Sequence, residues 1–525
     1  MNEQKITRWG ALVCLALVLG GLGLRLYQYA GTISNYPFTT YWSESYRIYS
    51  ASLIYSLKIY GQQLQWPWLD PGRSVLDGLV LLIPGTQIWM FRFWLVFLTI
   101  ATSTLASVLI IQRASRISGV ASKRTGIFMA VLSGWGILFF LQGPIYYHVL
   151  LGVLPVLWLF DLRKPTRTLV VILAASVWEG ICRVNWFGMP AVCAILLYLL
   201  VEPIGEKKIF QYLKWPVVWM LTGLLASGFI YLIFIKLTHY PVIFFNPAMH
   251  YPFFTSKLWP NIAFKPGLLQ GIAIILLPLV FLIAPVIVKK FLGLHWLRSI
   301  LTLGILAMFF AGSTYISLRA GGGYDLHNYD TFMLLFFIFA VYVGFGFVTF
   351  DRDDNKPAVP SLYPAIALVI MVVFPVYALV RNIHSNPPEL SREQTSALLA
   401  QLRDVVGNVN PAEGPILFID QRQLIVYRMI PAVKLYQPFD KIELMEMAMA
   451  NNTAYRDIFW KAIENKTFPL IISEVHPDSI QDANTPFGYE NNVWHDDVSF
   501  PILKNYERVY LNIDAGIGVY KPVGK

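Results

Sequence analysis

The sequence predicts a mainly α-helical fold, with a polytopic transmembrane helical bundle of about eleven helices and a small C-terminal α/β soluble domain. Hydrophobic residues make up 56% of the 525 residues and charged residues only 14%, whereas soluble proteins carry roughly 25% charged residues. Long apolar runs recur as far as residue 380. The charge balance then reverses, from 28 Lys and Arg against 13 Asp and Glu in residues 1–388 to 13 against 18 in residues 389–525.

The apolar runs are candidates for membrane spans, because a span needs roughly 20 mostly apolar residues. They cover residues 9–28, 87–111, 126–142, 144–160, 168–182, 189–204, 215–237, 267–288, 299–318, 331–349 and 361–380. The third, fourth and fifth runs are the shortest. No small-residue cleavage site follows the first run, so we expect a retained anchor and not a signal peptide.

Basic residues cluster in every second loop between these runs. Lys5 and Arg8 precede the first run, and later clusters lie within 113–124, 163–167, 207–214, 289–298 and 352–356. Cytoplasmic loops carry such an excess of Lys and Arg. The pattern predicts a protein integral to the plasma (inner) membrane with a cytoplasmic N-terminus. Eleven crossings then put the C-terminal domain on the extracytoplasmic side.

Two domains are expected, a transmembrane module over residues 1–388 and an extracytoplasmic α/β domain over residues 389–525. The first outer loop, residues 30–86, is long and rich in Tyr and Trp. Within it, aromatic and apolar residues recur at helical spacing, namely Tyr46, Tyr49, Leu53, Leu57 and Tyr60. This spacing predicts an amphipathic helix that lies in the headgroup region of the membrane.

The C-terminal residues alternate between helical and strand-like patterns. Helices are predicted at 391–406, 440–450 and 454–464, and strands at 416–419 and 470–473, with one or two more within 508–520. Such alternation is typical of a small α/β layer.

Composition and motifs limit the classes of partner and cofactor that the protein is expected to bind. A basic excess in loops between apolar runs favours contact with membrane lipids, and no RNP-like, zinc-finger or helix-turn-helix pattern indicates nucleic acid. His148, His239, His250 and His327 are dispersed and lack metal-site spacing. We therefore expect no metal site and no required cofactor. A divalent metal is possible but not indicated.

Six carboxylates fall on or near the outer side of this topology, and a carboxylate near hydrocarbon is a functional candidate. They are Glu44, Asp70, Asp77, Glu179, Asp325 and Asp330. Glu44 follows the first run among aromatics, where desolvation would raise its pKa toward that of a general base. The alternative is that Glu44 only pairs with Arg47. Asp70 and Asp77 are more simply read as solvated turn residues, and Asp330 as a partner of Arg319 or a helix cap.

Three arginines lie at the same level of the predicted bundle. Arg92 opens the second run, Arg183 follows the fifth and Arg319 ends the ninth. Each could extend its charged end from the membrane edge into water. If they face one outer cavity, they would bind phosphate or pyrophosphate, because guanidinium groups bind those oxygens bidentately.

The pattern resembles the GT-C membrane glycosyltransferases, which have a long first outer loop with an acid after the first helix, a multi-helix core and an outward soluble domain. The resemblance covers most of the chain. The stretches that carry it are 41–44 through 60–61, Met90-Phe-Arg-Phe-Trp94, Gly143-Pro-Ile-Tyr-Tyr-His148, Arg183-Val-Asn-Trp186 and Gly321-Gly-Gly-Tyr-Asp-Leu-His-Asn328. The chain departs from the family pattern in having a single acid at the first-loop position, where an acidic pair is usual.

The resemblance implies transfer of a sugar from a polyprenyl-phosphate carrier to an acceptor hydroxyl of a glycan, lipid or protein, with inversion. It implies Glu44 as the catalytic base and Arg92 and Arg183 as ligands of the donor phosphate. Arg319 is added to these ligands because of its position at the same level of the bundle. Further candidates for substrate binding are Asp70, His148, Asn185, Asp325, His327 and Asn328. Two alternatives stay open, a lipid or sugar transporter or flippase and a non-catalytic envelope assembly protein. Repeat symmetry and broken midplane helices would favour a transporter, whereas the polar residues here collect at one face.

Overall fold

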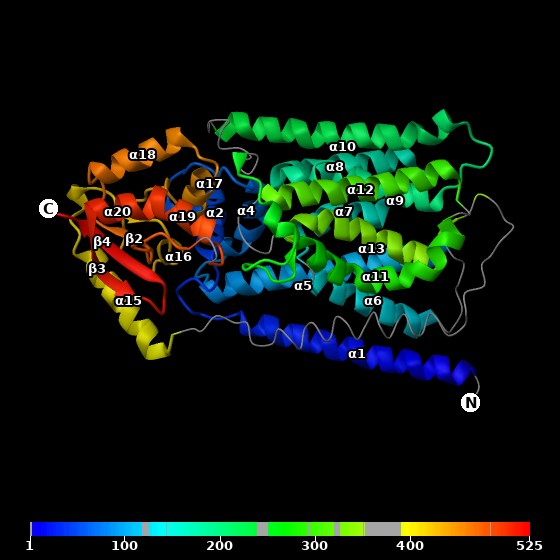
Figure 1. Cartoon of the computed structure of the whole chain (residues 1–525), viewed down its shortest axis with the longest axis horizontal. Coiled ribbons are helices and arrows are strands. Elements are labelled where there is room, and N and C mark those ends of the chain that lie inside the picture. The colour runs from blue at the N-terminus through cyan, green and yellow to red at the C-terminus, as the bar shows by residue number, and fades with distance from the viewer. Residues whose placement is uncertain are drawn as a thin grey trace.

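The computed structural model describes residues 3–117, 125–142, 144–238, 250–291, 294–319, 326–349, 351, 390–482 and 485–524. Long helices that run along the long axis form one part of the molecule, and the C-terminal residues form the other part around a small sheet (Figure 1). The first loop lies between these two parts (Figure 1). The prediction of a membrane helical bundle with a small C-terminal α/β part is confirmed.

Ten apolar helices of the bundle match the first ten predicted runs. They are α1 (Glu3–Gly31), α5 (Ile88–Ile117), α6 (Thr125–Gln142), α7 (Tyr147–Leu159), α8 (Pro165–Cys182), α9 (Met189–Val201), α10 (Ile209–Thr238), α11 (Gly267–Phe291), α12 (Trp296–Arg319) and α13 (Asp330–Gly344). In the described part of the chain, eight helical segments are long and apolar enough to cross a membrane, and α6 and α7 are shorter. The chain is therefore an integral membrane protein. The eleventh predicted run, 361–380, lies outside the described residues.

Burial separates the centre of the bundle from its periphery. Most of α13 is buried, and Phe337 on it packs against Trp135 and Phe139 of α6 at ring-centroid distances of 5.1 and 5.0 Å. By contrast, α10 leaves Phe210 and Leu225 mostly exposed. Apolar side chains that face outward on a long helix are those expected to contact lipid.

The first loop forms helices α2 (Glu44–Ile54), α3 (Ser56–Tyr60) and α4 (Pro71–Asp77), followed by the 3₁₀ turn η1 (Gly78–Leu82). The predicted helix is present, but its apolar face is covered by protein. Tyr49 and Leu53 are buried in a cluster that includes Val426 of the C-terminal part. Only Leu57, which is 65% exposed, keeps the outward position expected for a residue in the headgroup region.

The C-terminal part contains a four-stranded sheet in the order β1-β2-β4-β3. The strands are β1 (Leu417–Phe418), β2 (Ile471–Glu474), β3 (Tyr506–Asn512) and β4 (Ile517–Pro522). Strands β1 and β2 are parallel, and β4 pairs antiparallel with both β2 and β3. The helices are α15 (Arg392–Gly407), α16 (Gln423–Val426), α17 (Lys441–Met449), α18 (Thr453–Glu464), α19 (Gly488–Trp494) and α20 (Phe500–Asn505). Short turns complete the described elements, namely η2 (Val184–Trp186), η5 (Thr255–Leu258), η6 (Leu326–Tyr329), η7 (Pro411–Glu413) and the π-helical η8 (His495–Ser499).

Every helix and strand predicted for the C-terminal part is found. This part has two hydrophobic cores, one on each face of the sheet, because successive side chains of a strand point to opposite faces. Ile471 faces a cluster with Phe459 of α18, and its neighbour Ile472 faces a cluster with Leu398 of α15. Helix α15 begins in a capping box, in which Ser391 and Gln394 bond each other's backbone N–H groups. The predicted domain boundary at 388/389 lies outside the described residues.

The C-terminal part is fastened to the first loop by polar contacts. The Arg422 amide donates to Ser45 Oγ at 2.8 Å, and its guanidinium lies 4.7 Å from the centroid of the Tyr49 ring. Gln423 Nε2 donates to the Pro37 carbonyl at 3.1 Å. These contacts hold the first loop against the sheet domain.

Candidate functional site

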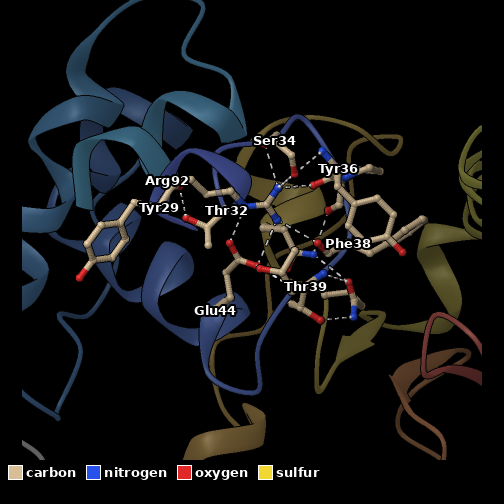
Figure 2. Close-up of polar contacts among 12 residues, drawn as sticks. Tyr29, Thr32, Ser34, Tyr36, Phe38, Thr39, Glu44 and Arg92 are labelled. Carbon is tan, nitrogen blue, oxygen red and sulfur yellow. Dashed lines mark hydrogen bonds and ion pairs between the residues drawn. The ribbon is translucent and has the colours of Figure 1, made fainter. Parts of the chain in front are cut away.

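Glu44 and Arg92 form a buried ion pair, in which the carboxylate and the guanidinium face each other (Figure 2). Arg92 Nε donates to Glu44 Oε1 at 2.7 Å and Nη2 donates to Oε2 at 3.1 Å. The amide and hydroxyl of Thr40 also donate to Oε2, at 2.7 and 3.0 Å. Glu44 is 1% exposed and Arg92 5%.

The rest of the Arg92 guanidinium bonds the chain that leads into α2. Nη1 donates to the carbonyls of Ser34 and Tyr36 at 2.9 Å each, and Nη2 to that of Phe38 at 3.1 Å (Figure 2). All three guanidinium nitrogens therefore donate within the protein. Contacts of this kind are typical of a structural ion pair. The roles of Glu44 as a general base and of Arg92 as a phosphate ligand stay predictions. The alternative pairing of Glu44 with Arg47 is not found.

Asp77 is the centre of a second buried network, which the expectation of a solvated turn residue did not anticipate. Arg47 Nη2 donates to Asp77 Oδ2 at 3.0 Å, while the Tyr147 hydroxyl donates to Oδ1 and His148 Nε2 lies 3.3 Å from it. Burial raises the pKa of Asp77, but the charge of Arg47 and these hydrogen bonds outweigh it and hold the pKa well below its usual range. Asp77 is therefore an ionised structural acceptor. His148 belongs to this network and is fully buried.

Two arginines meet at the Tyr146 ring, at the end of the bundle that faces the C-terminal part. Arg73 lies 4.8 Å and Arg183 5.6 Å from the ring centroid. Arg73 Nη1 also donates to Asp70 at 2.7 Å, and Arg183 Nη2 donates to Asn328 Oδ1 at 2.9 Å. Arg183 Nη1 and Arg73 Nε are buried without a hydrogen-bond partner among the described residues.

Further sequence candidates lie near Arg183 in space or in the chain, namely His327, Asn185 and Asp330. The His327 ring packs edge-on against Tyr146 at 5.6 Å. Asn185 lies half-buried in η2, the turn that follows Arg183. Trp186 Nε1 donates to Asp330 Oδ2 at 2.9 Å. Asp330 is the first residue of α13 and also accepts the Thr331 amide at 2.7 Å, but the N-cap position of this helix is Tyr329, so Asp330 is not its cap.

Asp70 has a strained backbone. Its φ is +48°, in the left-handed region, although it precedes Pro71, which disfavours helical conformations. Strain of this kind costs about 1–3 kcal/mol and is concentrated at functional sites. The Asp70–Arg73 pair is therefore held in position by the fold.

Glu446, on α17 of the C-terminal part, is the last member of a cluster that also contains Asp70, Arg73, Tyr146 and Arg183. It accepts a hydrogen bond from the Tyr251 hydroxyl. Burial raises the pKa of Glu446 to about 7, and the charges of Asp70 and Arg183 are close enough to act on it as well. A carboxyl with a pKa near neutrality can accept and release a proton under physiological conditions.

Three further candidates lie elsewhere. Arg319 packs over Tyr315 at 5.0 Å, and its Nη1 donates to the carbonyl of Tyr251, whose hydroxyl bonds Glu446. Glu179 is fully buried in α8, and neither carboxyl oxygen has a hydrogen-bond partner in the described part of the chain. Asp325 lies outside the described residues. Within the described ranges, no group of three His, Cys, Asp or Glu residues could hold a metal ion.

The residues that sequence reasoning missed are Arg73, Tyr146 and Glu446. The first two stood inside stretches already singled out, around Asp70 and at 143–148. Their cation–π geometry depends on how α4, α7 and η2 pack, which no local pattern encodes. Glu446 lies on an ordinary amphipathic helix, so the sequence carried no signal for it.

Neither a protein-family model nor a curated protein sequence matches the chain. Solved structures do match. ArnT from Cupriavidus metallidurans in the apo state is similar with a TM-score of 0.46 and 11% identity, over 96% of this chain and 97% of that chain. The same protein bound to undecaprenyl phosphate is similar with a TM-score of 0.48 and 12% identity, over 97% and 98% of the two chains.

Proposed function

We propose that this protein is an inverting membrane glycosyltransferase that transfers a sugar from a polyprenyl-phosphate carrier to an acceptor hydroxyl. The observation that carries the proposal is the meeting of Arg73 and Arg183 at the Tyr146 ring, beside a carboxyl with a pKa near 7, Glu446. These groups lie at the end of the bundle that faces the C-terminal part, where a lipid headgroup would be reached.

The arginines supply the phosphate site. Arg183 Nη1 and Arg73 Nε are buried donors without partners among the described residues, and a buried unsatisfied donor costs about 1–3 kcal/mol. A phosphate oxygen at this position would accept both. Guanidinium groups bind phosphate bidentately and keep their charge. As the bond to the sugar breaks, the same charges would stabilise the negative charge that develops on the leaving phosphate.

Glu446 is the proposed general base, in place of Glu44. It would take the proton of the acceptor hydroxyl while the acceptor oxygen forms a bond to the anomeric carbon. The bond from that carbon to the phosphate oxygen breaks, its electron pair stays on the phosphate, and polyprenyl phosphate leaves. In this proposal Glu44 has a structural role with Arg92, because Arg92 and Thr40 bond both of its oxygens.

The position of the cluster separates this proposal from a transporter. Transporter sites usually lie near the bilayer midplane. Here Asp70 and Arg73 belong to the first loop, and Glu446 belongs to the C-terminal part, so the cluster lies outside the spans. Such a place suits chemistry on a headgroup and an acceptor that arrives from water.

Binding of undecaprenyl phosphate to the purified protein in nanodiscs tests the phosphate site. Arg183→Ala should weaken binding about 10- to 100-fold, since a charged hydrogen bond contributes about 1.5–3 kcal/mol. Arg183→Lys should restore only part, because an ammonium group lacks the bidentate geometry. The matched control is Arg163→Ala, at an exposed loop position. Equal binding by all four proteins would refute the site.

Turnover tests the base. Glu446→Gln should lower release of undecaprenyl phosphate from a panel of undecaprenyl-phosphate-linked pentoses and hexoses by about 10²–10⁴-fold. Binding of the carrier should be retained. The control is Glu413→Gln, which changes an exposed glutamate of the same part of the chain. Parental turnover in Glu446→Gln would remove this residue from the mechanism.

A further inference from the structure

A cavity of about 540 Å³ lies between the first loop and the sheet, and the proposed reaction does not use it. Thr39 to Trp42 of the loop form one wall, and the residues that follow β1 and β2 form another. Because β1 and β2 are parallel, their carboxyl ends meet at the same edge of the sheet. Ligands of α/β sheets bind outside the carboxyl ends of the strands, and the volume falls within the range of small-molecule sites.

Charged groups on this edge are arranged around one lysine. Lys441 Nζ lies 3.2 Å from Asp420 Oδ2, two residues after β1, and 2.6 Å from Glu474 Oε2 at the end of β2. The three groups together carry one negative charge. This balance disfavours a phosphate or another anion. Carboxylate oxygens have lone pairs for more than one donor, so they can still accept hydrogen bonds from hydroxyl groups.

Two amide side chains add donors and acceptors on another side. Asn491 and Gln481 line the cavity, and Asn491 Nδ2 donates to Gln481 Oε1 at 2.8 Å. This contact fixes the two amides relative to each other. Their remaining amide atoms, Asn491 Oδ1 and Gln481 Nε2, are one acceptor and one donor.

Aromatic rings form the loop wall. Trp42 is 50% exposed and Tyr41 42% exposed, although both line the cavity. Lys441 Nζ lies 5.0 Å from the centroid of the Trp42 ring, which keeps this ring over the charged edge. An aromatic face carries partial negative charge, so it attracts the partly positive C–H groups of a sugar ring.

We propose that this cavity binds a neutral saccharide, which stacks on Trp42 and bonds its hydroxyl groups to Asp420, Glu474, Asn491 and Gln481. Aromatic faces beside carboxylates and amides match a molecule that has both a C–H face and a rim of hydroxyls. Arg47 and Asp77 are close enough to Tyr41 for their charges to act on its hydroxyl. The saccharide would therefore be held beside the buried Asp77 network.

Saturation-transfer NMR on the full-length protein in nanodiscs tests this site without any lipid donor, so its outcome is independent of the proposed transferase activity. The probes are glucose, galactose, mannose, rhamnose, arabinose and N-acetylglucosamine, with glucose 1-phosphate as the anionic comparison. At least one neutral sugar should bind, and more tightly than glucose 1-phosphate. Trp42→Ala should weaken that binding about tenfold.

Two further variants show whether a loss of sugar binding in Trp42→Ala comes from the loss of this ring at the cavity. Trp42→Phe retains a ring and should retain most of the binding, which separates loss of stacking from misfolding. Trp66→Ala removes another exposed tryptophan of the same loop, which does not line the cavity, and it should bind like the parent. The proposal is overturned if no neutral sugar in the panel binds, if Trp42→Ala binds like the parent, or if glucose 1-phosphate binds best.

Discussion

Replacing Glu44 by Gln separates the structural role that the contacts support from the catalytic role that the sequence predicted. Gln keeps the size of the side chain but removes its charge and puts an amide N–H₂ where one oxygen accepted a bond. In the protein, Glu44 accepts two bonds from Arg92, at 2.7 and 3.1 Å, and two from Thr40, at 2.7 and 3.0 Å. The substitution therefore leaves the Arg92 charge buried without a counter-ion.

Removing one partner of a buried ion pair typically lowers the free energy of unfolding by about 3–5 kcal/mol. We expect Glu44→Gln to have a clearly lower Tm in detergent, measured by tryptophan fluorescence. Glu44→Leu/Arg92→Leu should recover part of the loss, because no uncompensated charge remains. The matched control is Asp478→Asn, which breaks a surface pair with Arg508 and should change Tm little, since such pairs contribute about 0–1 kcal/mol.

Turnover is measured on the same samples at a temperature where each variant is folded. If the Glu44–Arg92 pair is structural, folded Glu44→Gln keeps binding undecaprenyl phosphate and turns over within about tenfold of the parent, well short of the 10²–10⁴-fold loss of a general base. The reasoning is refuted if Glu44→Gln has the parental Tm and has lost turnover. That outcome would return Glu44 to the position of catalytic base.

Three further predictions follow from other groups. Turnover should rise about fivefold between pH 6 and pH 7, because Glu446 has a pKa of about 7 and acts deprotonated; a flat profile would argue against it. Burial raises the pKa of Glu443 to about 7 from 4.5, so the folded state holds this proton more tightly, and stability measured by Tm should fall as pH rises across that interval. Glu443→Gln should make this dependence less steep, and Glu446, whose pKa is also raised to about 7, contributes to the part that remains. Finally, a cysteine at the exposed Ile513 should react with an impermeant maleimide on intact cells, in a variant with Cys14, Cys182 and Cys193 replaced by Ala. This result is expected if the C-terminal part is extracytoplasmic; reaction only after lysis would contradict that orientation.

The elements whose pattern is local could be predicted from the sequence. Helix α15 has its capping residues, β2 has its apolar run, and the bundle helices have continuous apolar stretches, so each was located to within a few residues. The partners of charged side chains could not be located in this way. Glu44 had Arg47 three residues away, yet it bonds Arg92, 48 residues along the chain. The choice between them is made by the packing of α2 against α5.

Burial of the first loop was misjudged for a similar reason. Aromatic residues that recur at helical spacing predict a helix with one apolar side, but the spacing does not show what covers that side. Lipid was the simplest expectation for Tyr49 and Leu53, and the structure covers them with the C-terminal part. Packing of the first loop against α7 turned Asp77 from an expected turn residue into a buried acceptor, with Tyr147 and His148 as its partners on that helix. Arg183 lies 5.9 Å from the centroid of the Trp186 ring, and its role as a phosphate ligand stays a prediction.

The bonds between the first loop and the C-terminal part also set an order of assembly. Ser45 and Pro37 bond Arg422 and Gln423, residues that lie 377 and 386 positions further along the chain. During synthesis the loop is therefore made long before its partners exist. All spans must be inserted into the membrane before the C-terminal part can cover the loop. Contacts between such distant residues form late and slowly. The apolar side of α2 should thus be accessible to chaperones or to the bilayer surface until translation ends. In a chain that stops before residue 422, this side of α2 would stay uncovered.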